Sequence, residues 1–384
     1  MEIYFDNSAT TKPYKEVIEE TAKAMEEYFG NPSSLHKIGI KAEKKITEAR
    51  EFIAKSINAS KEEIYFTSGG SEGNNLIVKG LAKPGHHIIT TSFEHHSVLM
   101  PYEELEKNGV RVTYLKLDKD GKISLEELEK SISKETVLVT IMHVNNEMGS
   151  IQNIEEIGRI IKEKSSRARF HVDAVQSYGK LDIDVKKMNI DMLTASGHKI
   201  HGPKGVGFTF IKKGIVLNPL INGGSQESGV RGGTHNVPGI VGLHKAAELT
   251  LENSKSSFEY VKSIKEYMIS RLSEIDNIRI NSPLRDDFTP YILNVSFIGV
   301  RAEVLLHLLE ESNIYVATGS ACTSRTSAAQ GSYVIKALGL NNKEVESAIR
   351  FSFSKFNTKE EVDKVIEILK SSLTFLRRVK RWIN

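Results

Sequence analysis

Apolar segments of strand length alternate with amphipathic segments of helical length through the first half of the chain, and this alternation constrains the fold most. The strand-like segments are EEIYFTS, HHIITTS, RVTYLKL, TVLVTIMHV and FHVDAV. Helical patterns lie between them at residues 71–83, 97–108, 124–132 and 154–164. Such alternation predicts an α/β fold with a mostly parallel sheet covered by helices. Ligands bind such sheets at the carboxyl ends of the strands.

A second unit is expected after a long, charged helical pattern at about residues 238–275, which we interpret as a crossing between domains. This unit spans roughly residues 260–384. It contains the strand YILNVSF, a helix in RAEVLLHLLEESN, the short strand IYVAT and a charged helix that starts near Thr358. In the first unit, Ser124 and Glu127 have the spacing of a capping box at the start of the 124–132 helix.

Composition excludes several classes of protein. The 384 residues are 39% hydrophobic and 26% charged, which is ordinary for a globular enzyme. The formal net charge of +3 is too small to indicate nucleic acid binding. No run approaches the roughly 18 apolar residues of a membrane helix, so we expect a cytoplasmic protein. Cys322 is the single cysteine, which excludes an intramolecular disulfide and leaves all thiol chemistry to that residue.

Lys199 lies between two histidines in TASGHKIHGPKGVG, among small residues. Desolvation disfavours the ammonium and lowers the pKa, so the free amine becomes available to an aldehyde. Most lysines are simply solvated. Asp173, at the end of an apolar strand in HVDAVQS, could pair with a pyridinium nitrogen or cap a turn. Gln176 could donate to a phenolate oxygen of the same ring, or cap the same turn.

The segment TSGGSEGNN joins a strand to a helix, and Gly70 would let an anion approach the N–H groups of the helix N-terminus closely. The chain has no G-x-G-x-x-G fingerprint and no P-loop, which disfavours a nicotinamide dehydrogenase or a P-loop nucleotidase.

His95, in EHHSV, could stack on a cofactor ring and exchange protons. A metal site formed with His86, His87 and His96 is the alternative. We disfavour it because adjacent residues of a strand point to opposite faces, and we expect no metal.

Together these motifs resemble the cysteine desulfurases, pyridoxal-phosphate enzymes of the class V aminotransferase group. The resemblance runs nearly end to end. Its motifs are YFDNSATT, GNPSSLH, TSGGSEGNN, EHHSV, VNNEMGSIQ, HVDAVQSYGK, SGHKIHGPKGVG, GGSQESGVRGGTHNVPGIVG, GSACTS and IRFSFSK.

The resemblance implies a role for each residue at the cofactor ring. Lys199 would hold the aldehyde of pyridoxal phosphate as a Schiff base, and Asp173 would pair with the ring nitrogen. Gln176 and Asn146 would lie near the ring hydroxyl, and His95 would stack on the ring as acid and base.

The phosphate of the cofactor would be held by Gly70, Ser71, Ser196 and His198. Thr234 would reach it from the other subunit of a homodimer. Many relatives have threonine in place of Ser71, which keeps the hydroxyl.

The substrate would be L-cysteine. Arg350 would bind its carboxylate as a bidentate fork, and Asn7 would also contact the substrate. The Cys322 thiolate would attack the substrate sulfur, which leaves alanine and a persulfide. Sulfur would pass to an acceptor protein, an iron-sulfur scaffold or a tRNA-thiolation enzyme, with no direct nucleic acid binding and no membrane association.

The resemblance also implies a fold type I pyridoxal-phosphate transferase with a seven-stranded sheet. The large cofactor-binding domain would span residues 15–260. The small α+β domain would consist of residues 1–14 and 261–384 and carry a mobile cysteine loop at about 317–331, of the longer subgroup.

Two alternatives stay open. A selenocysteine lyase or another class V pyridoxal enzyme would keep Lys199 and Asp173 without depending on Cys322. A noncatalytic sulfur-relay or RNA-associated platform is suggested by the basic cluster RRVKRW near the carboxyl end.

Overall fold

The computed structural model describes residues 2–319 and 332–383, and within them seven strands form a central sheet. The strand order is β2-β8-β7-β6-β5-β3-β4. The strand β8 runs antiparallel to β2 and β7, and the other neighbours are parallel. The α/β class and the mostly parallel sheet are thus confirmed. The strands are β2 (Ile64–Thr67), β3 (His87–Thr91), β4 (Arg111–Leu115), β5 (Thr136–Met142), β6 (Arg169–Asp173), β7 (Met192–Ser196) and β8 (Gly207–Ile211).

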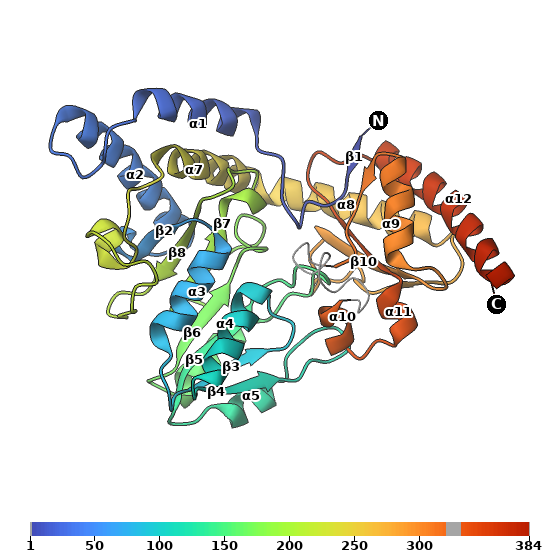
Figure 1. The fold of residues 1–384 in the computed structure, drawn as a ribbon, viewed down its shortest axis with the longest axis horizontal. Helices are drawn as coiled ribbons and strands as arrows, with labels where there is room; N and C mark the ends of the chain where they lie inside the picture. Colours follow the sequence, from blue (N-terminus) through green and yellow to red (C-terminus); the bar gives the residue numbers. More distant parts are fainter. Residues whose placement is uncertain (1, 320–331, 384) are drawn as a thin grey trace.

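Helices cover both faces of this sheet (Figure 1). Successive residues of a strand point to opposite faces, and the packing follows that rule. Ile88 packs with the α3 and α4 helices, whereas Ile89 packs with the core under α1, α2, α6 and α7. Because both faces are covered, β5 is buried along its whole length. These helices are α1 (Lys15–Glu27), α2 (Lys37–Ser56), α3 (Gly70–Leu81), α4 (His96–Lys107), α5 (Leu125–Ser131), α6 (Ile154–Lys164) and α7 (Val237–Glu252).

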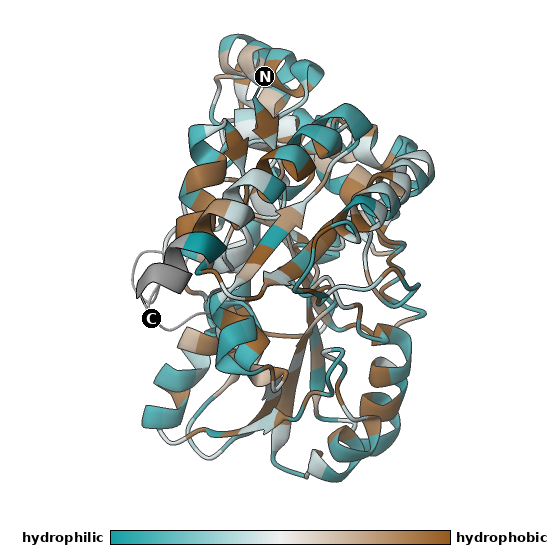
Figure 2. Ribbon diagram, turned by 90° about the vertical axis from the view of Figure 1, so that its right-hand side faces the viewer, coloured by the Kyte–Doolittle hydropathy of each residue, from teal (hydrophilic) through white to brown (hydrophobic). Residues whose placement is uncertain are grey.

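A second hydrophobic core lies on the other side of the molecule, around an antiparallel sheet of order β12-β10-β9. Apolar strand residues of this sheet lie beneath helices whose outer faces are polar (Figure 2). A short parallel pair, β1 with β11, lies beside it. The elements are β1 (Ile3–Tyr4), α8 (Ser254–Leu272), β9 (Ile278–Ile280), β10 (Ile292–Phe297), α9 (Ala302–Glu311), β11 (Ile314–Tyr315), α10 (Tyr333–Ala337), α11 (Asn342–Glu346), β12 (Ala348–Ser352) and α12 (Lys359–Ile383).

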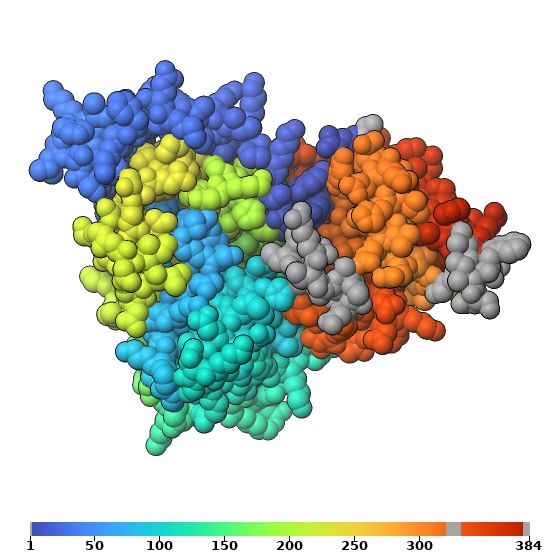
Figure 3. All heavy atoms as spheres, viewed as in Figure 1, coloured from blue at the N-terminus to red at the C-terminus, as the bar shows by residue number. Residues whose placement is uncertain are grey.

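The N-terminal segment connects the two cores. Ile3 and Phe5 belong to the second core, whereas Tyr14 and Val17 belong to the first. The residues between them therefore cross the junction, where the blue N-terminal atoms lie between the green and orange parts of the surface (Figure 3). The domain boundaries inferred from the sequence stay a prediction.

Two local expectations need correction. The helical pattern at 238–275 is two helices, α7 and α8, which meet at Asn253. The capping box is only half formed, because the Ser124 hydroxyl accepts from the Glu127 N–H at 3.2 Å while the Glu127 carboxylate accepts from the Lys116 N–H at 3.1 Å. The Glu127 side chain, which the local pattern assigned to the helix N-terminus, thus bonds the residue that follows β4.

Within the described residues, no helix combines the length and apolarity needed to cross a bilayer.

The second core contains a buried cation, Lys265 of α8, which has 0% exposure. Its Nζ donates to the carbonyls of Thr289 at 3.1 Å and Pro283 at 3.4 Å. Burial lowers the pKa of Lys265 to about 7. Between that value and its ordinary pKa, the unfolded state binds more protons than the folded state, so stability rises with pH.

We therefore expect the free energy of unfolding to lose this pH dependence in Lys265→Met. The difference between wild type and variant should change by about 1.4 kcal/mol per pH unit between pH 7 and 10, in favour of wild type as pH rises. Urea denaturation at pH 6, 7.5 and 9 measures it. Lys262→Met, on the same helix but partly exposed, is the control. Parallel curves for Lys265→Met and wild type would contradict the burial argument.

Candidate functional site

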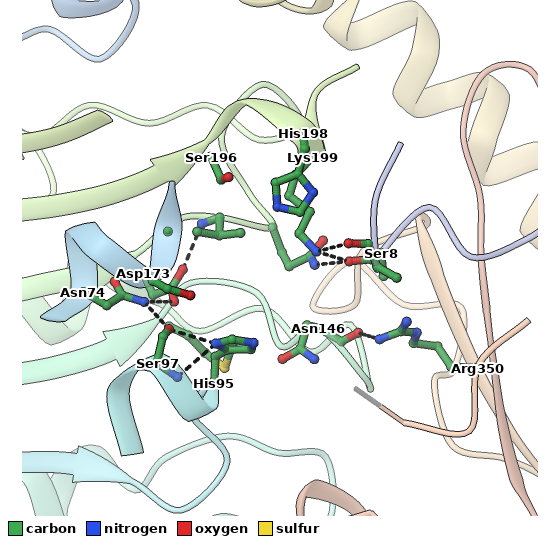
Figure 4. A pocket seen from close by; sticks show the side chains of 16 residues that line it. Ser8, Asn74, His95, Ser97, Asn146, Asp173, Ser196, His198, Lys199 and Arg350 are labelled. Carbon is green, nitrogen blue, oxygen red and sulfur yellow. Dashed lines mark hydrogen bonds between the residues drawn. The ribbon is translucent and has the colours of Figure 1, made fainter. Parts of the chain in front are cut away.

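A cavity of about 190 Å³ lies at the carboxyl ends of the parallel strands and reaches across the junction to β12. It brings together most of the residues singled out from the sequence (Figure 4). The predicted residues that line it are Gly70, Ser71, His95, Asn146, Asp173, Gln176, Ser196, His198, Lys199 and Arg350. Cys322 and the segment 320–331 lie outside the described residues.

Lys199 ends a single 3-10 turn, Gly197–Lys199, that directly follows β7. The small residues around Lys199 allow close packing of this turn. A Cβ on Gly197 would lie 3.1 Å from the Pro203 carbonyl oxygen. The Lys199 Nζ donates to the carbonyl oxygens of Ser8 and, at 2.8 Å, of Ala9. The N-terminal segment therefore holds the amine at the cavity wall.

Asp173 is the last residue of β6 and is 4% exposed. Its two carboxylate oxygens accept from the Val175 N–H at 2.9 Å and from the Asn74 Nδ2 at 2.8 Å. Burial raises the pKa of Asp173, and these two hydrogen bonds oppose the rise. A protonated ring nitrogen in the cavity would relieve the same desolvation, because it would supply the missing positive charge.

His95 caps the N-terminus of α4. Its Nδ1 accepts from the Ser97 N–H at 3.1 Å, which leaves the ring proton of the neutral imidazole on Nε2. Burial and then the positive charge of Lys199 lower the pKa of His95 to about 4. The ring is therefore neutral at physiological pH.

The N-terminus of α3 fits a phosphate group. Its first N–H groups have no partner within the helix, and the helix starts at Gly70. A Cβ on Gly70 would lie 2.8 Å from Val175 Cγ2, so a larger residue would push against a neighbouring part of the cavity wall. Ser196 and His198 line the same cavity. Burial, followed by the charges of Lys199, Lys204 and Lys180, lowers the pKa of His198 to about 3, so this ring is neutral as well.

Arg350 enters the cavity from β12 with 1% exposure. Its guanidinium donates to the Asp6 carboxylate at 2.7 Å and to the Asn146 carbonyl oxygen at 2.9 Å. Its Nε has no hydrogen-bond partner among the described residues. A guanidinium carries five N–H donors, so donors remain for an incoming carboxylate.

Two predicted residues do not line this cavity. The Asn7 amide is turned to the backbone, where it donates to the carbonyls of Ser352 at 2.9 Å and Tyr4 at 3.2 Å. Thr234 is exposed on the segment before α7.

Six other residues line the cavity. No role was predicted for them from the sequence, although several lie in the motifs quoted there. Asn74, in TSGGSEGNN, joins Asp173 to Ser97 through its Nδ2. Ser8 supplies the carbonyl for Lys199. The motif context was the only signal for them. The full set is Ser8, Ala9, Asn74, Ser97, Met142 and Val175.

The arrangement fits pyridoxal phosphate: an enclosed amine, a buried carboxylate and a glycine-lined helix N-terminus surround one cavity. The side-chain oxygens of Asn74 and Asn146 are buried and have no hydrogen-bond partner in the described residues, as expected beside a bound polar ligand. No cluster of histidine, cysteine or acidic residues suited to a metal ion occurs in residues 2–319 and 332–383.

Comparison with known proteins gives consistent matches. Residues 3–365 match the family model "Aminotransferase class-V". A cysteine desulfurase IscS of Clostridium botulinum is 44% identical over 376 residues, with 96% of this chain and 93% of that protein covered. The IscS of Methanosarcina thermophila is 44% identical over 381 residues, with 98% and 93% covered.

Solved structures agree with the sequence matches. A NifS-like protein superposes with a TM-score of 0.91 at 40% identity and covers 98% of this chain and 100% of its own. A structure described as SspA in complex with cysteine has a TM-score of 0.81 at 38% identity, with 93% and 100% covered.

Gly70→Ala should weaken binding of pyridoxal phosphate to the apo-protein by roughly tenfold, since overpacking of this kind costs about 1–3 kcal/mol. Equilibrium dialysis measures the dissociation constant. Val175→Ala removes the atom that the new Cβ would meet, so the double variant should recover most of the affinity. Unchanged affinity in Gly70→Ala would show that the glycine is not needed for approach.

Proposed function

This chain belongs to the aminotransferase class-V family and is a pyridoxal-phosphate-dependent cysteine desulfurase, and on that premise we propose how its residues divide the work. One observation carries the assignment of roles. The amine of Lys199, the carboxylate of Asp173 and the N-terminus of α3 line one cavity at the ends of neighbouring strands. One ring with an aldehyde, a basic nitrogen and a phosphate would engage all three.

Lys199 would hold the cofactor covalently and Asp173 would face its ring nitrogen. Gly70, Ser71, Ser196 and His198 would hold its phosphate. When bound, pyridoxal phosphate supplies an electron sink that stabilises negative charge at the substrate Cα.

The ring environment also includes two amides. Gln176 and Asn146 would lie at the ring hydroxyl, since both line the cavity with Lys199. The neutral His95 would lie against the ring. To accept a substrate proton at Nε2, its ring proton would move to Nδ1, which lies 2.8 Å from the Ser97 hydroxyl oxygen. The low pKa of His95 means that the imidazole is neutral when cysteine arrives.

L-Cysteine would bind with its carboxylate on Arg350, in competition with Asp6 for the guanidinium. The buried position of Arg350 supports this role, since a charge-assisted bidentate bond is strongest where water is excluded. Asn7 would act indirectly, because its amide donates to the backbone of Ser352, the last residue of β12, rather than facing the cavity.

Cys322 would be the nucleophile. Its thiolate would form a sulfur–sulfur bond with the substrate while the carbon–sulfur bond of the substrate breaks, and the carbon skeleton would leave as alanine after protonation. The persulfide sulfur would pass to an acceptor protein, an iron-sulfur scaffold or a tRNA-thiolation enzyme. The IscS name of the curated relatives favours the scaffold. We place this activity in the cytoplasm.

We also propose a homodimer in which Thr234 reaches the phosphate site of the second subunit. The segment that carries it is fixed by Glu227, which accepts a bidentate pair from Arg50 at 2.8 Å and a bond from His235 at 2.7 Å. Burial raises the pKa of Glu227, but the bonds from Arg50 and His235 lower it to about 2. These hydrogen bonds restrain the segment that carries Thr234, as expected for a residue that must contact another chain in a fixed position. An exposed apolar set on α1, α2 and the turn between them supports the interface: Met25, Phe29, Leu35 and Ile38.

The division of work is tested by two variants. Cys322→Ser should retain the visible absorbance of bound pyridoxal phosphate yet release no sulfide from cysteine. Lys199→Ala should no longer become covalently labelled with pyridoxal phosphate on treatment with borohydride, as the wild type does. Absorbance, sulfide and alanine assays measure these outcomes. Full turnover by Cys322→Ser would place the nucleophile elsewhere, and faster turnover of selenocysteine by that variant would favour a selenocysteine lyase.

Arg350→Lys should raise the KM for cysteine at least about tenfold and change kcat less, because lysine cannot form the planar two-bond contact. Affinity for pyridoxal phosphate should be unchanged. Arg301→Lys, an exposed arginine paired only with Glu303 in the described ion pairs, is the control. An unchanged KM in Arg350→Lys would remove Arg350 from the substrate site.

A further inference from the structure

A second, smaller cavity adjoins the first and shares Lys199 with it. Lys180 lies on this second cavity, four residues after Gln176 in HVDAVQSYGK, and has no part in the functions described above. Its ammonium lies 5.3 Å from the centroid of the Tyr291 ring. Among the described residues no carboxylate forms an ion pair with Lys180. Burial lowers its pKa to about 8.

The polar contact of Lys180 is with Gln176. The Lys180 Nζ donates to the Gln176 Oε1 at 3.4 Å. That distance is long for a hydrogen bond, so the interaction is mainly between a charge and the amide dipole. Because no carboxylate among the described residues pairs with the ammonium, its charge acts on this amide dipole without a competing anion.

An ammonium group can only donate hydrogen bonds, so only one orientation of the amide is favourable beside it. The oxygen of Gln176 must face Lys180, and the nitrogen must face the opposite way. In that orientation the Gln176 Nε2 donates to the Ser8 carbonyl oxygen at 2.9 Å. The same carbonyl accepts from Lys199. The N–H groups of Gln176 are therefore presented at the wall that carries the reactive amine.

We infer that Lys180 is a positioning residue that fixes the side-chain amide of Gln176 with its N–H groups toward the cofactor cavity, where they meet the ring hydroxyl oxygen. This inference rests on the proposed function, since it presumes that Gln176 contacts the cofactor ring. Lys180 acts through Gln176 and touches neither cofactor nor substrate.

The other charged and titratable groups around the second cavity are the same in wild type and in every Lys180 variant. They are Lys199, Lys355, His201, Tyr14 and Tyr291. Lys355 provides a matched control, because it lines the same cavity but lies over the Tyr14 ring at 4.4 Å rather than at Gln176.

The experiment follows the visible absorbance of bound pyridoxal phosphate as a function of pH. Lys180→Met should raise the pH midpoint of the absorbance change by about one unit, since a positive charge and an aimed donor near the site are both lost. It should also raise the cofactor dissociation constant by roughly threefold. Lys180→Arg should keep the wild-type midpoint, and Lys355→Met should leave it unchanged.

A double-mutant cycle separates positioning from simple electrostatics. In a Gln176→Leu background, Lys180→Met should shift the midpoint by less than half as much, because the amide it orients is gone. A full shift in that background, or no shift in Lys180→Met alone, would overturn the inference.

Two further outcomes are distinguishable. Failure of the wild type to bind pyridoxal phosphate would overturn the proposed function together with the inference, whereas a coloured wild type with an unaffected Lys180→Met overturns the inference alone. Thermal denaturation of each apo-variant checks folding. Should Lys180→Met not fold, Lys180→Gln is measured instead and must show the same shift.

Discussion

The hydrogen bonds from Lys199 to the carbonyls of Ser8 and Ala9 are the interaction on which the rest of the site depends. A carbonyl oxygen satisfies an enclosed amine without bringing a full negative charge, which would favour the unreactive ammonium. The same segment continues to bind the lysine loop. The Thr11 N–H donates to the His198 carbonyl at 2.9 Å, and the Thr11 hydroxyl accepts from the His201 N–H at 2.7 Å. A stretch of chain outside the central sheet thus sets the geometry at the ends of its strands.

Three charged side chains line the cavity: Lys199, Arg350 and Asp173. Arg350 is paired with the Asp6 carboxylate, which does not line it. Burial lowers the pKa values of His95 and His198, to about 4 and about 3, so these rings add polarity without adding charge. An incoming anion would therefore meet Lys199 and the remaining donors of Arg350, whereas the buried carboxylate of Asp173 would suit a cationic ring nitrogen.

Strand-by-strand prediction succeeded where the local pattern is unambiguous. The segments that became β2 to β6 are short, apolar and bounded by polar residues, and α6 begins and ends as expected. The pattern did not single out β7, β8 and β12. In β7 and β12 small or polar residues interrupt the apolar pattern, and β8 begins at a glycine directly after the glycine-containing segment 202–206.

At the site, residues that could carry the chemistry, such as Lys199 and Asp173, were predictable from the sequence. The residues that hold them in place were not. The Arg350–Asp6 pair joins positions 344 apart, and Asn74 reaches Asp173 across 99 positions, so only the folded chain reveals them. The direction of a side chain is equally hidden, as Asn7 shows by turning its amide to the backbone.

The pairing of β1 with β11, and of Asp6 with Ser352, has a consequence for folding during synthesis. Residues 3–6 pair with residues that lie more than 300 positions later in the chain. At ordinary rates of translation β1 waits roughly half a minute for its partners. The central sheet can form meanwhile, but the segment that holds Lys199 gains its final support only when the strand around position 350 has emerged. A chain truncated before that strand would therefore fold its central sheet and still leave the lysine segment unsupported.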